Sequence, residues 1–191
     1  CVDGVSMQPA FEAVQMSASS KFINNKCDGQ GRSWYDGVNA FARNCTVNDN
    51  EILNFGQWLS GTTYAARGDG IFFSNAATYI SGCEAQRNKI QGCAKNGIFI
   101  IGAKMVRVHG NHIVGNRMSG IQIAFLLGLS SNNASGLTIT GNTVEYNGAD
   151  SFDCNNNSGN PLVDTNVNAI VAHNIFRSNG WIYPTRAEQL S

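Results

Sequence analysis

The chain has 191 residues, which is long enough for one domain with a substantial hydrophobic core. Only 14% of the residues are charged and the formal net charge is +0, so nucleic acid and acidic membranes are not expected as partners. No apolar run reaches the roughly 18 residues of a membrane span, so insertion into a membrane is not expected either.

The first of two recurring sequence patterns is a small polar or acidic residue, then glycine, then an apolar-x-apolar triplet. Its copies begin at Asp3, Asp36, Asp69, Asn96 and Ser119, with a degenerate copy at Asp150. Apolar residues at alternate positions predict short strands with one buried face. The predicted strands cover residues 5–7, 38–40, 71–73, 98–100, 121–123 and 152–154.

The second pattern is apolar-x-x-Asn-x-apolar, and it follows each copy of the first. Its asparagines are Asn25, Asn50, Asn88, Asn111, Asn142 and Asn174. Five positions later the last three of these are followed by Asn116, Asn147 and Asn179, and Cys93 takes that place after Asn88. An asparagine repeated at one bend can bond the backbone of its neighbours, so we expect asparagine ladders.

The two patterns keep a fixed phase while the segments between them vary in length. This behaviour predicts rungs of short strands that stack about 4.8 Å apart and pair in parallel. Leucine-rich and helical repeats are disfavoured, because the rungs lack long segments of helical period. The expected fold is all-β: a right-handed single-stranded parallel β-helix of about six to seven rungs with variable insertions.

This pattern resembles the right-handed parallel β-helix of the pectin-lyase-like superfamily, which includes phage tailspikes, polysaccharide lyases and uronan epimerases. The resemblance runs from Asp3 to about Asn179. We expect residues 1–180 to form the β-helix domain, as part of a longer chain, and residues 181–191 to form a tail or a cap. The polygalacturonase motifs and the Asp-Pro-His-Glu signature of alginate epimerases are absent, so no catalytic residue of the superfamily is carried over.

The first strand of each rung predicts an outward column. It consists of Ser6, Asn39, Phe72, Phe99, Gln122 and Asp153. Phe72, Phe99 and Gln122 are candidates for binding substrate, with the aromatic rings stacking on sugars. The alternative is that a variable segment of a neighbouring rung folds over the two phenylalanines.

Carboxylates are the candidates for catalysis. Asp150 and Asp153 are the preferred pair, because they lie where the glycine is lost and beside the polar insertion at 155–160. Glu145 or Asp69 could supply a partner from another rung, since glycoside hydrolysis uses two carboxyl groups across a cleft. The alternative is that these acids are ordinary turn residues.

Three basic residues, Arg107, His109 and His112, occupy predicted outward positions. They could hold a uronate carboxylate or act as acid and base, or they could be plain surface.

The six cysteines include no Cys-x-x-Cys pair, so neither a metal site nor a cofactor is expected. Cys45 and Cys83 should stack inward in one column, where reduced thiols are favoured over a disulfide, and Cys27 and Cys154 should also face inward.

Together these features favour a carbohydrate-active β-helix that binds and cleaves a polysaccharide, either secreted or on a virion surface. The alternative is a non-catalytic structural or adhesive segment that forms a homotrimer or binds glycan without cleaving it. A calcium-dependent lyase is disfavoured, because the acids are dispersed over the rungs.

Overall fold

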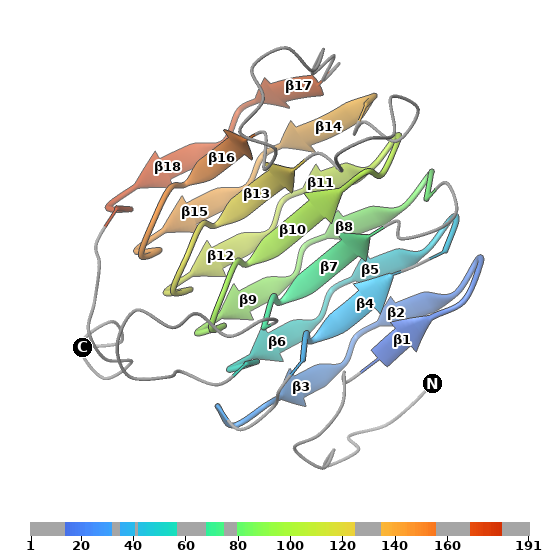
Figure 1. Cartoon of the computed structure of the whole chain (residues 1–191), viewed down its shortest axis with the longest axis horizontal. Coiled ribbons are helices and arrows are strands. Elements are labelled where there is room, and N and C mark those ends of the chain that lie inside the picture. The colour runs from blue at the N-terminus through green and yellow to red at the C-terminus, as the bar shows by residue number, and fades with distance from the viewer. Residues whose placement is uncertain are drawn as a thin grey trace.

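The structure is a computed structural model that describes residues 14–31, 35–40, 42–56, 68–74, 80–124, 135–155 and 169–180. The described residues form strands β1 to β18 and no helix. The strands make three parallel six-stranded sheets, and each successive trio of strands forms one rung with one strand in each sheet. Figure 1 shows the rungs stacked from β1–β3 to β16–β18. The predicted parallel β-helix is therefore confirmed, with six rungs in the described part of the chain.

The three sheets are named A, B and C in chain order. Sheet A consists of β1 (Val14–Met16), β4 (Val38–Ala40), β7 (Ile71–Ser74), β10 (Ile98–Ile101), β13 (Ile121–Ala124) and β16 (Phe152–Asn155). Sheet B consists of β2 (Lys21–Ile23), β5 (Thr46–Asn48), β8 (Glu84–Gln86), β11 (Arg107–His109), β14 (Leu137–Thr140) and β17 (Ala169–Ala172). Sheet C consists of β3 (Lys26–Asp28), β6 (Glu51–Leu53), β9 (Lys89–Gln91), β12 (His112–Val114), β15 (Thr143–Glu145) and β18 (Ile175–Arg177).

The first rung does not begin where the sequence pattern placed it. The strand that pairs with β4 is β1, in the register Val14 opposite Val38, whereas the prediction used residues 5–7, which lie outside the described residues. The prediction was misled because the residue before Val14 is Ala13 rather than glycine. The later sheet A strands pair in the predicted register, including Ile98 opposite Ile121.

The core is built from columns of like residues that stack from rung to rung. In sheet C, Ile52, Ile90, Ile113 and Val144 occupy successive middle positions and are fully buried. Each side chain of this kind contributes about 2 kcal/mol through burial. Because one rung cannot bury its own apolar side, this contribution exists only in the stack.

The recurring glycine is required by close packing. A Cβ on Gly97 would lie 2.2 Å from Cγ2 of Ile113 and 2.7 Å from the Gly120 carbonyl oxygen. Gly97 and Gly120 do not have positive φ, so close packing and not backbone conformation requires glycine at these positions. In the sixth rung Ser151 takes this place, and its Oγ accepts a hydrogen bond from Asn179 Nδ2 at 2.7 Å.

The predicted asparagine ladder is confirmed, and Asn111 shows its bonding. The Asn111 Oδ1 accepts hydrogen bonds from the main-chain N and the Nδ2 of Asn88, both at 2.9 Å. The Asn111 Nδ2 donates to the Ala85 carbonyl and to Asn142 Oδ1, also at 2.9 Å. These bonds satisfy the buried backbone groups at the bend between sheets B and C.

A second ladder, also predicted, follows the strands of sheet C. The main-chain N of Cys93 donates to Asn116 Oδ1 at 3.0 Å, and the main-chain N of Asn116 donates to Asn147 Oδ1 at 3.0 Å. The last step runs from the main-chain N of Asn147 to Asn179 Oδ1, at 2.9 Å. From the third rung to the sixth, each rung is therefore held to the next at two bends.

The sixth rung is more open than the rungs before it. Large apolar side chains are exposed at Ile170, Val171, Ile175 and Phe176. Cys154 is in register with the buried Ile123, as expected for an inward position, yet it is exposed. The predicted tail at 181–191 lies outside the described residues.

Candidate functional site

The outward column of sheet A is the first candidate surface. The strand register places Asn39, Phe72, Phe99, Gln122 and Asp153 side by side on consecutive rungs. Four of the candidate residues thus lie together, as the repeat predicted. Asn39 is fully buried, Phe99 and Gln122 are each 8% exposed, and Phe72 and Asp153 are half-buried. Solvent therefore reaches this column mainly at Phe72 and Asp153.

Two aromatic rings stack in the middle of the column. The ring centroids of Phe72 and Phe99 are 5.2 Å apart, and the ring planes differ by 8°. The Lys95 Nζ lies 5.7 Å from the centroid of the Phe99 ring. A stacked pair contributes about 0.5–1.5 kcal/mol beyond burial, and a nearby ammonium adds a cation–π attraction. Sequence reasoning missed Lys95, because its position in the turn carries no repeat signal.

A row of hydrogen-bonded polar side chains runs beside the aromatic pair and links two candidate acids. Asn96 Nδ2 donates to Asp69 Oδ1 and to Gln122 Oε1, both at 2.9 Å. Gln122 Nε2 then donates to Asp153 Oδ2 at 2.8 Å. The row Asp69–Asn96–Gln122–Asp153 therefore crosses four rungs. The sequence marks Asn96 only as the first residue of one copy of the glycine pattern, because the packing of the rungs sets the direction of its side chain.

Asp69 at the inner end of this row has a perturbed acidity. Burial, reinforced by the neighbouring Asp36 carboxylate, raises the pKa of Asp69 to about 7. The positive charge of Lys95 and the hydrogen bonds from Asn96 act in the opposite direction. Burial therefore favours the protonated form of this carboxyl group at pH values where an exposed aspartate is ionised.

The preferred acid pair lies in the sixth rung. Asp150 is exposed in the turn before β16, and Asp153 is half-buried on the outward side of β16. Asp69 is three rungs from Asp153, which corresponds to roughly 14 Å at the spacing of parallel strands. Hydrolytic pairs are about 5–9.5 Å apart, so Asp69 is too far from Asp153 to be its partner, whereas Asp150 belongs to the same rung.

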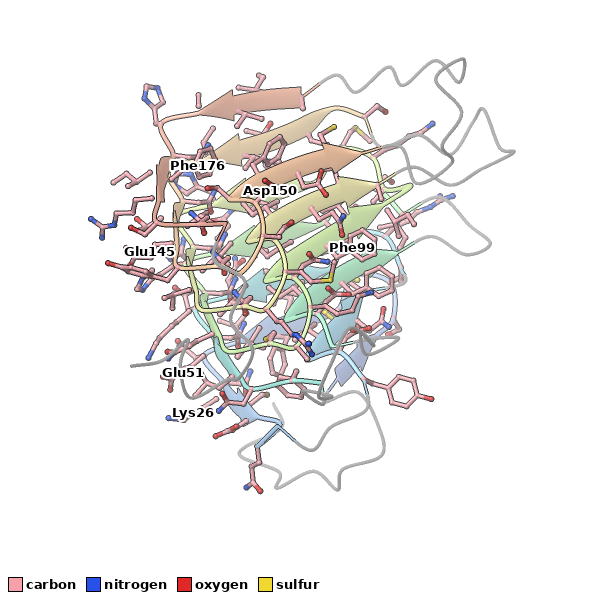
Figure 2. All side chains as sticks on the ribbon, turned by 60° about the vertical axis from the view of Figure 1, so that its left-hand side comes forward. Lys26, Glu51, Phe99, Glu145, Asp150 and Phe176 are labelled. Carbon is pink, nitrogen blue, oxygen red and sulfur yellow. The ribbon has the colours of Figure 1, made fainter. Side chains whose placement is uncertain are left out.

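Glu145, the remaining candidate acid, belongs to sheet C. Its Oε1 lies 2.8 Å from His112 Nε2, and its Oε2 accepts a hydrogen bond from Arg177 Nε. The hydrogen bond from Arg177 has the largest effect, and together with the bond from His112 it holds the pKa of Glu145 below its usual range. Figure 2 shows Glu145 along the same side as Glu51 and Lys26, apart from Phe99. Glu145 therefore does not share a surface with Asp153.

The three basic candidates are divided between two sheets. Arg107 and His109 are exposed on β11 of sheet B, and His112 is exposed on β12 of sheet C. Arg107 Nη2 lies 3.6 Å from Glu84 Oε2, and His109 Nδ1 lies 3.0 Å from Thr140 Oγ1. The structure therefore does not bring the trio together around one ligand position.

The described residues contain no group of three or more His, Cys, Asp or Glu side chains that could hold a metal ion. In the same part of the chain, no helix is long and apolar enough to cross a membrane.

The stacked rungs, the three parallel sheets and the asparagine ladders define this chain as a parallel β-helix protein. It belongs to the family described as the right handed beta helix region, whose model matches residues 12–186. No curated protein sequence matches the chain.

Two solved structures to which the chain is similar are both named as epimerases. One is a threonine-to-asparagine variant of the periplasmic alginate epimerase AlgG, with a TM-score of 0.54 and 16% identity, covering 84% of this chain and 36% of that chain. The other is the A-module of the mannuronan C-5 epimerase AlgE4 of Azotobacter vinelandii, with a TM-score of 0.30 and 17% identity, covering 85% of this chain and 52% of that chain. The chain thus spans about a third of the AlgG chain, and the AlgG likeness shows the shared fold.

Proposed function

We propose that this β-helix binds a polysaccharide along the outward side of sheet A, around β13 and β16. The observation that carries the proposal is the hydrogen-bonded row Asp69–Asn96–Gln122–Asp153 beside the Phe72–Phe99 stack. Amides and carboxylates bond sugar hydroxyls, and aromatic rings pack against the apolar faces of sugars. A polymer lying along the solenoid axis meets the column at the half-buried Phe72 and Asp153, which are three rungs or roughly 14 Å apart. The buried Asn96 and Gln122 hold Asp153 in place from below.

The fold supports this substrate class, because the AlgG structure that shares it is named as an alginate epimerase. The same structure is named as periplasmic, so we propose that this protein also works outside the cytoplasm, as a secreted or surface protein. Anionic polymers such as alginate are the first substrates to test. Arg107, His109 and His112 lie on sheets B and C and are not part of the proposed site.

The finer proposal is that the bound polymer is cleaved in the sixth rung. Asp153 would act as the acid or base, held in place by the Gln122 amide at 2.8 Å. Asp150 would be its partner, exposed in the turn of the same rung. Two carboxyl groups in different surroundings can divide the acid and base roles of glycoside hydrolysis.

A second candidate is a non-catalytic β-helix that adheres to glycan or forms a homotrimer. The separation of the acids favours it, since Asp69 is three rungs from Asp153 and Glu145 is on another sheet. In that case the row on sheet A binds sugars without chemistry.

The test uses alginate and a panel of bacterial capsular polysaccharides. New reducing ends indicate hydrolysis, the ultraviolet absorbance of an unsaturated uronate indicates a lyase, and proton NMR of the intact polymer detects epimerisation. Asp153→Asn and Asp150→Asn should abolish cleavage and keep binding, whereas the control Glu145→Gln on sheet C should keep both. Binding without any product supports the second candidate. If no polymer binds, the polysaccharide proposal is wrong.

A further inference from the structure

Cys45 and Cys83 lie at the same point of consecutive rungs. Cys45 directly precedes β5 and Cys83 directly precedes β8, and these strands pair with Thr46 opposite Glu84. The main-chain N of Glu84 donates to the Cys45 carbonyl at 2.9 Å. Both cysteines are free and fully buried. The two thiols therefore stack in one column of sheet B, as the sequence predicted.

The two sulfur atoms converge on one backbone group. Cys83 Sγ lies 3.1 Å from the Ala42 carbonyl oxygen, and Cys45 Sγ lies 3.5 Å from the same oxygen. The main-chain N of Cys45 lies 3.4 Å from Cys83 Sγ. Cys27 and Cys154, by contrast, are in register with Ile52 and Ile123. The Cys45–Cys83 pair is thus built by the register of the solenoid.

We propose that Cys45 and Cys83 form a reversible disulfide that staples the second rung to the third when the protein meets a small-molecule disulfide such as glutathione disulfide. Facing residues of parallel strands have Cα atoms about 4.8 Å apart, which is inside the range of roughly 4.4–6.8 Å seen in disulfides. The Cβ atoms must approach to about 3.8 Å. Both thiols are fully buried, so the turn before β5, in which Arg43 and Asn44 are exposed, must open to admit the disulfide and to bring the two Cβ atoms together.

The different surroundings of the two thiols determine which of them attacks first. Cys83 Sγ makes the shorter contact to the Ala42 carbonyl oxygen, 3.1 Å against 3.5 Å for Cys45 Sγ, so the Cys83 thiol proton is the more firmly held. The contact between the two thiols acts in the same direction, because it lowers the pKa of Cys45 to about 7 and raises the pKa of Cys83. Cys45 is therefore the first nucleophile, because the thiolate is the attacking form. The Cys45 thiolate attacks one sulfur of glutathione disulfide, and the S–S bond breaks to release one glutathione thiolate.

In the second step that thiolate, or water, takes the proton of Cys83. The Cys83 sulfur then attacks the Cys45 sulfur of the mixed disulfide and displaces the second glutathione. The protein loses two electrons and two protons, and one glutathione disulfide becomes two glutathione thiols.

The test treats the whole chain with glutathione disulfide, alkylates the remaining thiols, and maps the peptides by mass spectrometry without reduction. We expect a Cys45–Cys83 linked peptide that disappears with dithiothreitol. We also expect the midpoint of thermal unfolding to rise by at least about 3 °C, because the link closes a long loop in the unfolded chain.

The matched variant is Cys83→Val, chosen because Val106 is the next residue in the same buried column. It should fold, form no linked peptide and show no rise in the unfolding midpoint with oxidant. Exposed Cys154 reports that the oxidant is active, since it should be glutathionylated in both proteins. The proposal is overturned if Cys154 of the wild type reacts while Cys45 and Cys83 remain unlinked, or if the variant shows the same rise.

Discussion

Asn111→Ala should be among the most damaging single changes at the bends between the sheets of this solenoid. The substitution removes the acceptor of two hydrogen bonds from Asn88 and the donor of the bonds to Ala85 and Asn142, all four at 2.9 Å. Asn111 is buried, so water cannot replace these partners. At about 1 kcal/mol for each lost bond, the free energy of unfolding should fall by about 4 kcal/mol.

Asn25→Ala is the matched control at the end of the same ladder. The Asn25 Nδ2 donates to the Ile23 carbonyl at 2.9 Å and to Asn50 Oδ1 at 3.3 Å, and the side chain is partly open to solvent. Its loss should cost about 1 kcal/mol or less. Urea unfolding followed by far-ultraviolet circular dichroism measures both variants. Equal losses for Asn25→Ala and Asn111→Ala would refute the view that the buried ladder holds the rungs together.

Three further predictions concern packing and pH. Gly97→Ala should destabilise the fold by about 3 kcal/mol, because its Cβ overlaps Ile113, whereas Gly110→Ala should cost only about 1 kcal/mol, since its Cβ has space but its φ is +63°. Thermal unfolding of both variants checks this difference. Because the pKa of Asp69 is raised in the folded protein, ionisation of this group lowers the free energy of unfolding as pH rises from about 4 to 7. Asp69→Asn should remove this decrease, so the variant should be more stable than the wild type at pH 8. The pKa of Glu145 is depressed, so its stabilisation is present above the ordinary carboxyl pKa and disappears as pH falls through the folded value. Glu145→Gln should remove that dependence and cost about 1 kcal/mol or less at neutral pH in the same unfolding assay, since both partners are largely exposed.

The fold was predictable because its stabilising interactions repeat in the sequence. The ladder asparagines and the glycines at 37, 70, 97 and 120 mark equivalent positions of successive rungs, so the register of sheet A from β4 onward follows from the pattern. The first rung was placed wrongly, because Val14 follows an alanine and its apolar-x-apolar triplet lacked the expected marker.

The site was predictable only in part. Gln122 and Asp153 share one position of the repeat, so their placement on one column follows from the sequence. The raised pKa of Asp69 depends on burial and on the side-chain direction of Asn96, which no repeat position encodes. Arg107 and His112 are close in the chain, yet the bend at Asn111 places them on different sheets.

The most direct test of the proposed site is calorimetric titration of the protein with alginate oligosaccharides and the capsular panel. The wild type is compared with Gln122→Leu, which breaks the row on sheet A, and with Arg107→Ala on sheet B. We predict that Gln122→Leu weakens binding at least about tenfold, equivalent to about 1.4 kcal/mol, while Arg107→Ala binds as the wild type does. Undiminished binding by Gln122→Leu, or a loss confined to Arg107→Ala, would contradict the placement of the polysaccharide on sheet A.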